Sequence, residues 1–151
     1  MGNCSCVNEL TLDIKYHVEG LNKIEKVSLS DWVDLRAAET VHLKAGEFKL
    51  INLGVSMRLP SGYEAYIVPR SSTFKNFGII QTNHMGVIDN SYSGDNDIWH
   101  MAVYAMRDTT IEFNARICQF RLNKVQPAII FNEVLQLNGK DRGGFGSSGV
   151  I

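Results

Sequence analysis

A carboxylate and an aromatic ring lie close together in the segment from residue 83 to residue 94. Asp89 follows an apolar run and stands three residues before Tyr92. The exposed backbone of a hairpin offers hydrogen-bonding groups at a fixed spacing that suit the edge of a pyrimidine. The segment therefore predicts a hairpin with Asp89 near its tip, beside a sugar. The alternative is an ordinary turn, because Asp, Asn and Ser favour turns through local hydrogen bonds.

A second segment, residues 69–73, combines a cation with hydroxyl groups at the end of an expected strand. Arg70 is followed by Ser71, Ser72 and Thr73. A guanidinium group, hydroxyls and fresh backbone donors are the groups that an oligophosphate requires. The alternative is that these hydroxyls only cap the first turn of a helix.

The stretch from residue 142 to residue 149 contains four glycines in eight residues. Such a composition does not pack as a strand, and we expect the segment to be mobile without a ligand.

Period-two alternation of apolar and polar residues dominates the rest of the chain. It runs through residues 10–18 and again through 51–59, where it stops at the turn residues Pro60, Ser61 and Gly62. Further strands are expected at 63–68, 98–106, 116–122 and 128–134, and one short helical stretch at about 72–76. This pattern predicts an all-β domain of the sandwich or barrel type.

Composition limits the possible functions. The 151 residues fit one domain, and the formal net charge of -1 provides no footprint for a nucleic-acid backbone or an anionic membrane. No apolar run is long enough for a membrane span. The three cysteines, Cys4, Cys6 and Cys118, form no CxxC pair, which favours reduced thiols and a cytoplasmic protein.

Five ordered segments together resemble the motifs of the trimeric dUTP pyrophosphatase (dUTPase) family. They are DLRAA (34–38), PRSS (69–72), GVIDNSYSG (86–94), RICQ (116–119) and RGGFGSSG (142–149). The resemblance implies a distorted, jelly-roll-like β-barrel over residues 1–141 and a flexible arm over 142–151 that closes the active site. It also implies hydrolysis of dUTP to dUMP and pyrophosphate, which removes dUTP from the nucleotide pool and supplies a dTTP precursor.

The resemblance also implies a role for each matching residue. Asp89 is expected to activate the water that attacks the α-phosphorus, and Tyr92 to lie under the deoxyribose and exclude ribonucleotides. The remaining expected catalytic residues are Asp34 and Gln119, and the remaining expected substrate-binding residues are Arg70, Ser71, Ser72, Asn83, Gly86, Ile88, Arg142, Phe145, Ser147 and Ser148.

Magnesium is the cofactor that the resemblance implies. The ion is expected to be held by phosphate oxygens and waters, with Asp34 acting through water and no direct protein ligand. The implied assembly is a homotrimer in which the arm of one subunit reaches the site of another.

Departures from the family pattern concern the arm. Two residues are missing between Arg142 and Phe145 relative to longer family tails, so both cannot occupy their usual places. Short tails of this kind resemble dUTPases of Gram-positive bacteria and their phages. Phe145 is expected to cover the uracil, and Trp99 is the alternative for this lid.

Two other functions stay open at this point. A dCTP deaminase shares the fold and the arginine-serine segment, but it lacks the GVIDxxYxG arrangement. A phage regulatory protein that binds a repressor is the second alternative, and such binding is compatible with catalysis.

Overall fold

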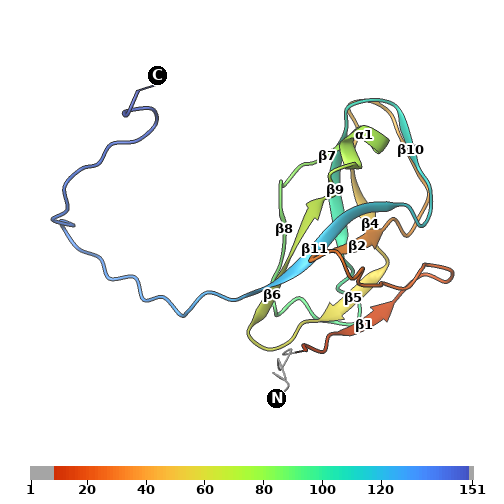
Figure 1. Ribbon diagram of the computed structural model, residues 1–151, viewed down its shortest axis with the longest axis horizontal. Coiled ribbons are helices and arrows are strands. Elements are labelled where there is room, and N and C mark those ends of the chain that lie inside the picture. Colours follow the sequence, from red (N-terminus) through yellow and green to blue (C-terminus); the bar gives the residue numbers. More distant parts are fainter. Residues whose placement is uncertain (1–8, 150–151) are drawn as a thin grey trace, which may run out of the picture.

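Short antiparallel strands dominate the computed structural model, which describes residues 9–149 (Figure 1). Cys4 and Cys6 lie outside the described residues. The elements are β1 (Asp13–Tyr16), β2 (Val33–Arg36), β3 (Val41–Leu43), β4 (Phe48–Asn52), β5 (Val55–Arg58), β6 (Tyr63–Pro69), α1 (Thr73–Phe77), β7 (Ile79–Gln81), β8 (Gly86–Ile88), β9 (His100–Ala105), β10 (Thr109–Ile111) and β11 (Arg116–Lys124).

The strands form four sheets within the described part of the chain. The largest has the order β2-β11-β6-β8, the next is β4-β9-β7, and β1-β5 and β10-β3 are two-stranded pairs. None of these four described sheets closes on itself into a barrel. The prediction of an all-β fold with one short helix near residues 72–76 is confirmed over the described range.

The sheet β2-β11-β6-β8 has one face in the core and one face outside. Ala65 and Ile67 of β6 and Phe120 of β11 face inward and are buried. Because successive side chains alternate between the two faces of a strand, Gln119 faces outward. Gln119 pairs with Asp34 on β2 and with Val68 on β6, so these three residues share the outer face.

The alternation at residues 51–59 predicted one strand, and this prediction is wrong because the chain turns at Gly54 between β4 and β5. Gly54 has a φ of 69°, and a Cβ there would lie 2.7 Å from the Cβ of Ala38 and from Leu21 Cδ2. Only glycine fits this close approach without displacing the core. The apolar pattern continues through the turn because both strands bury the same kind of residue.

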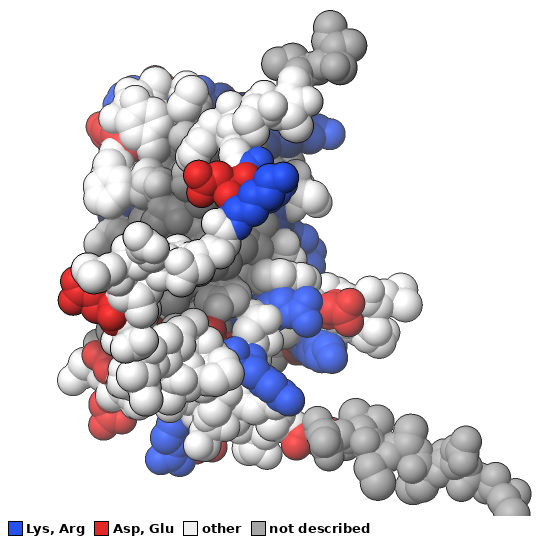
Figure 2. Space-filling model, turned by 90° about the vertical axis from the view of Figure 1, so that its left-hand side faces the viewer, with Lys and Arg blue, Asp and Glu red and all other residues white. Residues whose placement is uncertain are grey.

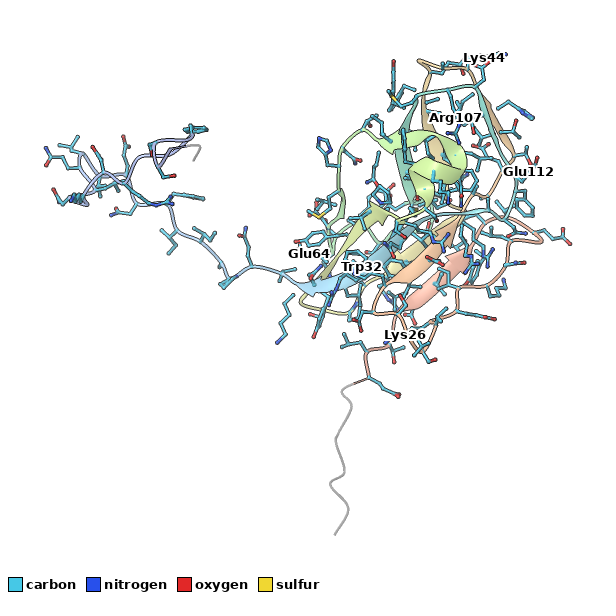
Figure 3. The ribbon with its side chains drawn as sticks, turned by 45° about the horizontal axis from the view of Figure 1, so that its top comes forward. Lys26, Trp32, Lys44, Glu64, Arg107 and Glu112 are labelled. Atoms are coloured by element: carbon cyan, nitrogen blue, oxygen red, sulfur yellow. The ribbon has the colours of Figure 1, made fainter. Side chains whose placement is uncertain are left out.

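The strand predicted at residues 128–134 is absent from the described structure. Beyond Lys124 the chain runs as an extended segment away from the domain, as Figures 1 and 3 show from two directions. Its apolar side chains are exposed: the exposed fraction is 93% for Ile130, 91% for Phe131 and 103% for Leu135. A segment rich in β-branched and aromatic residues forms a strand only beside a partner strand, and the described part of this chain supplies none at that place.

No helix in residues 9–149 is long and apolar enough to span a membrane. Figure 2, which faces the side from which the C-terminal segment extends, shows basic and acidic side chains interspersed over that side of the molecule.

Candidate active site

Asp34 on β2 lies between two arginines at one end of the large sheet. Its Oδ1 is 2.9 Å from Arg70 Nε, and its Oδ2 is 3.4 Å from Nη1 of Arg116. Asp34 and Arg70 are both about three-quarters buried, which reduces the screening of their charges by water. One carboxylate against two guanidinium groups leaves an excess of positive charge, and this cluster therefore suits a phosphate group.

The arrangement of β11 brings this cluster together. Cys118 pairs with Leu35, whereas Arg116 pairs with Arg36, so Ile117 forms a β-bulge between them. Bulges re-aim neighbouring side chains, and this one accompanies the contact of Arg116 with Asp34. Gln119, on the outer face next to the cluster, donates from Nε2 to the Pro69 carbonyl at 3.1 Å.

Thr73, which the sequence analysis grouped with the serine hydroxyls, locks the arginine-serine turn to β11. Its buried hydroxyl accepts a hydrogen bond from the Arg70 backbone N–H at 2.8 Å and donates one to the Ile117 carbonyl at 2.9 Å. The turn is thereby fixed on β11 beside Arg116. The signal in the sequence was a threonine directly after the two serines, but a hydroxyl that binds backbone is indistinguishable there from one that binds a ligand.

Ser71 is exposed and Ser72 is half-buried. Ser72 occupies the N-cap position of α1, yet in the described structure its side chain makes no capping hydrogen bond. The capping interpretation of this serine is therefore not supported.

Cys118 is buried beside the cluster. Burial, with a smaller contribution from the Asp34 carboxylate, raises the pKa of its thiol. A thiol of this kind is protonated at neutral pH and is a core residue rather than a nucleophile.

The segment expected to read a pyrimidine lies along β6 rather than in a two-stranded hairpin. β8 pairs with β6, and the described chain forms turns and no strand from Asp89 to Trp99, so the expected hairpin with Asp89 near its tip is corrected. Gly86 and Ile88 are buried on β8, and Asn83 is exposed in the connection before it. A Cβ on Gly86 would lie 3.2 Å from the Cβ of Ile67, so this glycine allows β8 to approach β6 closely.

Asp89 directly follows β8 and is exposed, in a turn closed by the Tyr92 N–H, which donates to the Asp89 carbonyl at 3.0 Å. Asn90 holds this turn to the domain, because its Nδ2 donates to the carbonyls of Pro60 at 2.9 Å and Tyr63 at 2.8 Å. Asn90 is thus a structural anchor that the sequence analysis did not identify. The Tyr92 hydroxyl donates to the Ile98 carbonyl at 3.1 Å, and 38% of the residue is exposed.

Asp89 and Arg70 lie at opposite ends of β6. Ile88 pairs with Ala65, so Asp89 is level with Glu64, which Figure 3 shows at the end of β6 remote from α1. Arg70 is six residues further along the chain, a distance of about 20 Å at the usual rise of a strand. The structure therefore brings Asp34, Arg70 and Gln119 together, and it does not bring Asp89 to them within one chain.

The expected arm residues lie apart from both groups. Arg142, Phe145, Ser147 and Ser148 are exposed on the extended C-terminal segment (Figure 1). The described hydrogen bonds of this part are local turns, Ser147 N–H to the Gly144 carbonyl and Gly149 N–H to the Gly146 carbonyl.

Trp99 is not a lid, and this alternative is corrected. Its side chain is 0% exposed and packs edge-on against Phe120, with ring centroids 5.3 Å apart and an interplanar angle of 87°. A ring enclosed by the core has no path to a ligand on the outer face. Phe145, by contrast, is fully exposed.

The geometry thus defines an all-β protein whose outer sheet face carries a guanidinium cluster at one end and an exposed carboxylate at the other. Residues 30–149 match the family model described as dUTPase. The SPbeta prophage-derived deoxyuridine 5′-triphosphate nucleotidohydrolase of Bacillus subtilis (strain 168) is 58% identical over 141 residues, which cover 93% of this chain and 99% of that protein. The deoxyuridine 5′-triphosphate nucleotidohydrolase of Thermoanaerobacter sp. (strain X514) is 38% identical over 114 residues, 74% of this chain and 76% of that protein. The chain belongs to the dUTPase family.

Solved structures agree with this fold. A dUTPase of Staphylococcus bacteriophage 80alpha with dUpNHpp gives a TM-score of 0.78 at 21% identity and covers 93% of this chain and 99% of that chain. A dUTPase from phage phi11 of S. aureus, described with a structural Mg(II) ion, gives a TM-score of 0.74 at 16% identity and covers 86% of this chain and 100% of that chain. The prediction of the family and of its short-tailed phage and Gram-positive form is confirmed.

Proposed function

We propose that this protein hydrolyses dUTP to dUMP and pyrophosphate, removing dUTP from the nucleotide pool and supplying a precursor of dTTP. The observation that carries the proposal is the guanidinium pair held by Asp34 beside the arginine-serine turn, in a chain of the dUTPase family. The family match also favours this activity over that of a dCTP deaminase.

Asp89 is the general base of the proposed reaction. It is exposed directly after β8, where a water and a sugar have access to its carboxylate. A positioned base of this kind contributes about 10²- to 10⁴-fold to the rate. It takes a proton from the water that attacks the α-phosphorus and accepts a hydrogen bond from the 3′-hydroxyl of the sugar.

The base and sugar lie along β8 in this proposal. Asn83, Gly86 and Ile88 contact the uracil, and the close approach of β8 to β6 at Gly86 keeps this strand rigid. The ring of Tyr92 is fixed by its hydroxyl contact to Ile98 and lies under the deoxyribose. A fixed ring leaves no space for a 2′-hydroxyl, so UTP is excluded.

The phosphates bind at the guanidinium cluster. Arg70 and the hydroxyls of Ser71 and Ser72 neutralise and orient the chain of phosphates, with Gln119 alongside. Asp34 fixes the direction of the Arg70 guanidinium through the 2.9 Å contact.

The residues present fit a magnesium ion that reaches the protein through its substrate. No group of three or more His, Cys, Asp or Glu residues in the described range is arranged to hold a metal directly. The longer contact of Asp34 Oδ2, at 3.4 Å, leaves that carboxylate lone pairs for a water of the ion. When bound, Mg²⁺ neutralises charge on the phosphates and holds them in one conformation.

The active unit is a homotrimer with a composite site. Asp89 and Arg70 are about 20 Å apart along β6, too far for one substrate to place its α-phosphorus at Asp89 and its phosphates at Arg70. Asp89 of one copy and the guanidinium cluster of another complete the site together. The exposed apolar residues after Lys124, such as Ile130 and Phe131, also need a second copy to be buried.

The arm closes the assembled site. Arg142, Ser147 and Ser148 bind the γ-phosphate, and Phe145 covers the uracil of a neighbouring copy. The glycines of this segment let backbone amides approach phosphate closely, and binding of the nucleotide orders the arm over the site.

Incubation with dUTP, dCTP or UTP in the presence of magnesium, followed by separation of the products, tests the proposal. We expect dUMP and pyrophosphate from dUTP and little turnover of the other two. Ammonia from dCTP would establish the deaminase instead, and equal turnover of UTP would remove Tyr92 from its role.

A repressor-type protein partner stays a prediction. It is tested by mixing the protein with candidate repressors, with and without dUTP, and measuring complex formation. A complex that dUTP dissociates would indicate that partner and substrate share the site.

A further inference from the structure

Gln81, at the end of β7, is a buried amide that contacts one of the proposed uracil-binding residues. Only 5% of the residue is exposed. Its Nε2 donates to the Ile67 carbonyl at 3.0 Å and to Asn83 Oδ1 at 3.1 Å. Both protons of the Gln81 amide are therefore used, one for the strand β6 and one for Asn83.

These contacts fix the direction of both amide groups. The Ile67 carbonyl only accepts hydrogen bonds, so the NH₂ group of Gln81, and not its oxygen, must face it. The same NH₂ group then meets Asn83, so Asn83 must present its oxygen inward. Its own NH₂ group consequently points away from Gln81, on an exposed side chain at the proposed uracil site.

The remaining oxygen of Gln81 indicates that the Ile67 carbonyl orients Gln81 and that Gln81 in turn orients Asn83. Gln81 Oε1 is buried and has no hydrogen-bond partner among residues 9–149. A buried acceptor without a partner is unfavourable, so Gln81 would rotate if its own oxygen decided its orientation. Its orientation is instead dictated by the Ile67 carbonyl, which accepts a hydrogen bond only from the NH₂ group.

We propose that Gln81 is a positioning residue for pyrimidine selection: it locks Asn83 as an outward hydrogen-bond donor, so that the site accepts uracil and rejects cytosine. This inference rests on the proposed dUTP hydrolysis. The 4-position of uracil carries a carbonyl acceptor, whereas that of cytosine carries an amino donor. A donor fixed at Asn83 forms a hydrogen bond with the uracil carbonyl. The amino group of cytosine would instead face another donor and stay unpaired.

The test compares the ratio of kcat/KM for dUTP to kcat/KM for dCTP among variants of Gln81 and Asn83. Gln81→Met keeps the shape of the side chain but removes both donors, which frees the Asn83 amide to rotate. We expect the ratio to fall roughly tenfold, the worth of one hydrogen bond in a buried site. Gln81→Glu should lower it further, because a carboxylate draws the NH₂ group of Asn83 inward and turns its oxygen toward the substrate.

Asn83→Asp changes only the exposed partner of Gln81. It tests the inference even if the substitutions of the buried Gln81 prevent folding. Its outward atom is an acceptor, so the dUTP to dCTP ratio should fall at least as far as in Gln81→Met. In an Asn83→Ala background, Gln81→Met should change the ratio by less than about twofold, since Gln81 acts only through Asn83.

The outcomes separate this inference from the proposed function. Absence of dUTP hydrolysis by the wild-type protein would reject the function itself. A wild-type protein that hydrolyses dUTP, together with a Gln81→Met variant that lowers both kcat/KM values by the same factor, would overturn the inference and leave Gln81 a purely structural residue. Thermal unfolding and sedimentation of each variant show whether fold and assembly are retained.

Discussion

Asp89 and Arg70 stand at opposite ends of the same strand, because Asp89 is level with Glu64 and Arg70 follows Pro69 at the far end of β6. A water-activating carboxylate and the phosphate-binding arginine of one reaction need to be within a few ångströms of the same substrate. Under the proposed mechanism, the separation along β6 therefore requires that the two residues of one site come from different copies of the chain.

Subunit complementation follows from this separation. Asp89→Asn and Arg70→Ala should each be nearly inactive alone, because every site of a homotrimer then lacks one group. Refolding the two variants together in equal amounts should restore about one quarter of wild-type activity, since random mixing leaves that share of composite sites intact. The measurement is dUTP turnover of the refolded mixture. A mixture no more active than the sum of its parents would place both residues in one chain's site.

Asp89→Asn tests the base itself. Asparagine keeps the size of the side chain and its contact with a sugar hydroxyl, but it does not accept a proton. We expect kcat to fall at least about 10²-fold while dUTP still binds, given the usual worth of a general base. Single-turnover kinetics and equilibrium binding measure the two effects separately. Near-normal turnover would mean that another group activates the water.

The all-β fold was predictable because its longer strands carry enough alternation to be recognised. β6 and β11, of seven and nine residues, lie where the period-two pattern placed them. β2, β3 and β10 have only three or four residues each, too few for a period to be visible, and the sequence analysis gave none of them. The strand predicted at 128–134 is absent for a different reason. Its residues favour a strand, but the described part of one chain offers no neighbouring strand to pair with.

The turns that carry the candidate site were predictable from local sequence, whereas the contacts between its residues were not. The arginine-serine turn and the Asp89 turn are local in sequence, and local turn chemistry identifies them. The pairing of Asp34 with Arg70 and Arg116 depends on strand register across β2, β11 and β6, which no spacing along the chain encodes. Thr73 and Gln81 were missed for the same reason, since their hydrogen-bond partners lie 44 and 14 residues away.

Truncation after Asp141 tests the arm. The described residues 142–149 are exposed and make local turn hydrogen bonds, so their removal should leave the unfolding midpoint of the domain within a few degrees of wild type. Turnover of dUTP should fall about 10²-fold or more, because the γ-phosphate loses its clamp and the site stays open to water. The single variants Arg142→Ala and Phe145→Ala show how much of this loss comes from the γ-phosphate contact and how much from the cover over the uracil. An unchanged rate after truncation would remove the arm from the mechanism.

Asp108 gives a pH-dependent contribution to stability away from the site. Its Oδ1 accepts a hydrogen bond from the Ala45 backbone N–H at 2.9 Å, and its Oδ2 is 3.3 Å from Lys44 Nζ. These contacts favour the ionised form and lower the pKa of Asp108 below its ordinary value of 3.8, the Ala45 hydrogen bond first and Lys44 second.

A group whose pKa is lower in the folded state binds fewer protons there than in the unfolded chain, so it stabilises the fold at pH values above its unfolded pKa. Asp108→Asn should therefore lower the urea midpoint at pH 7. The difference from wild type should shrink below pH 3.8 and vanish below the folded pKa, where the wild-type side chain is also neutral. Lys44→Met is the matched control and should reproduce only part of the effect, because the Ala45 hydrogen bond stays. A difference that is constant from pH 7 to acid would show that the asparagine acts through its shape and not through the lost charge.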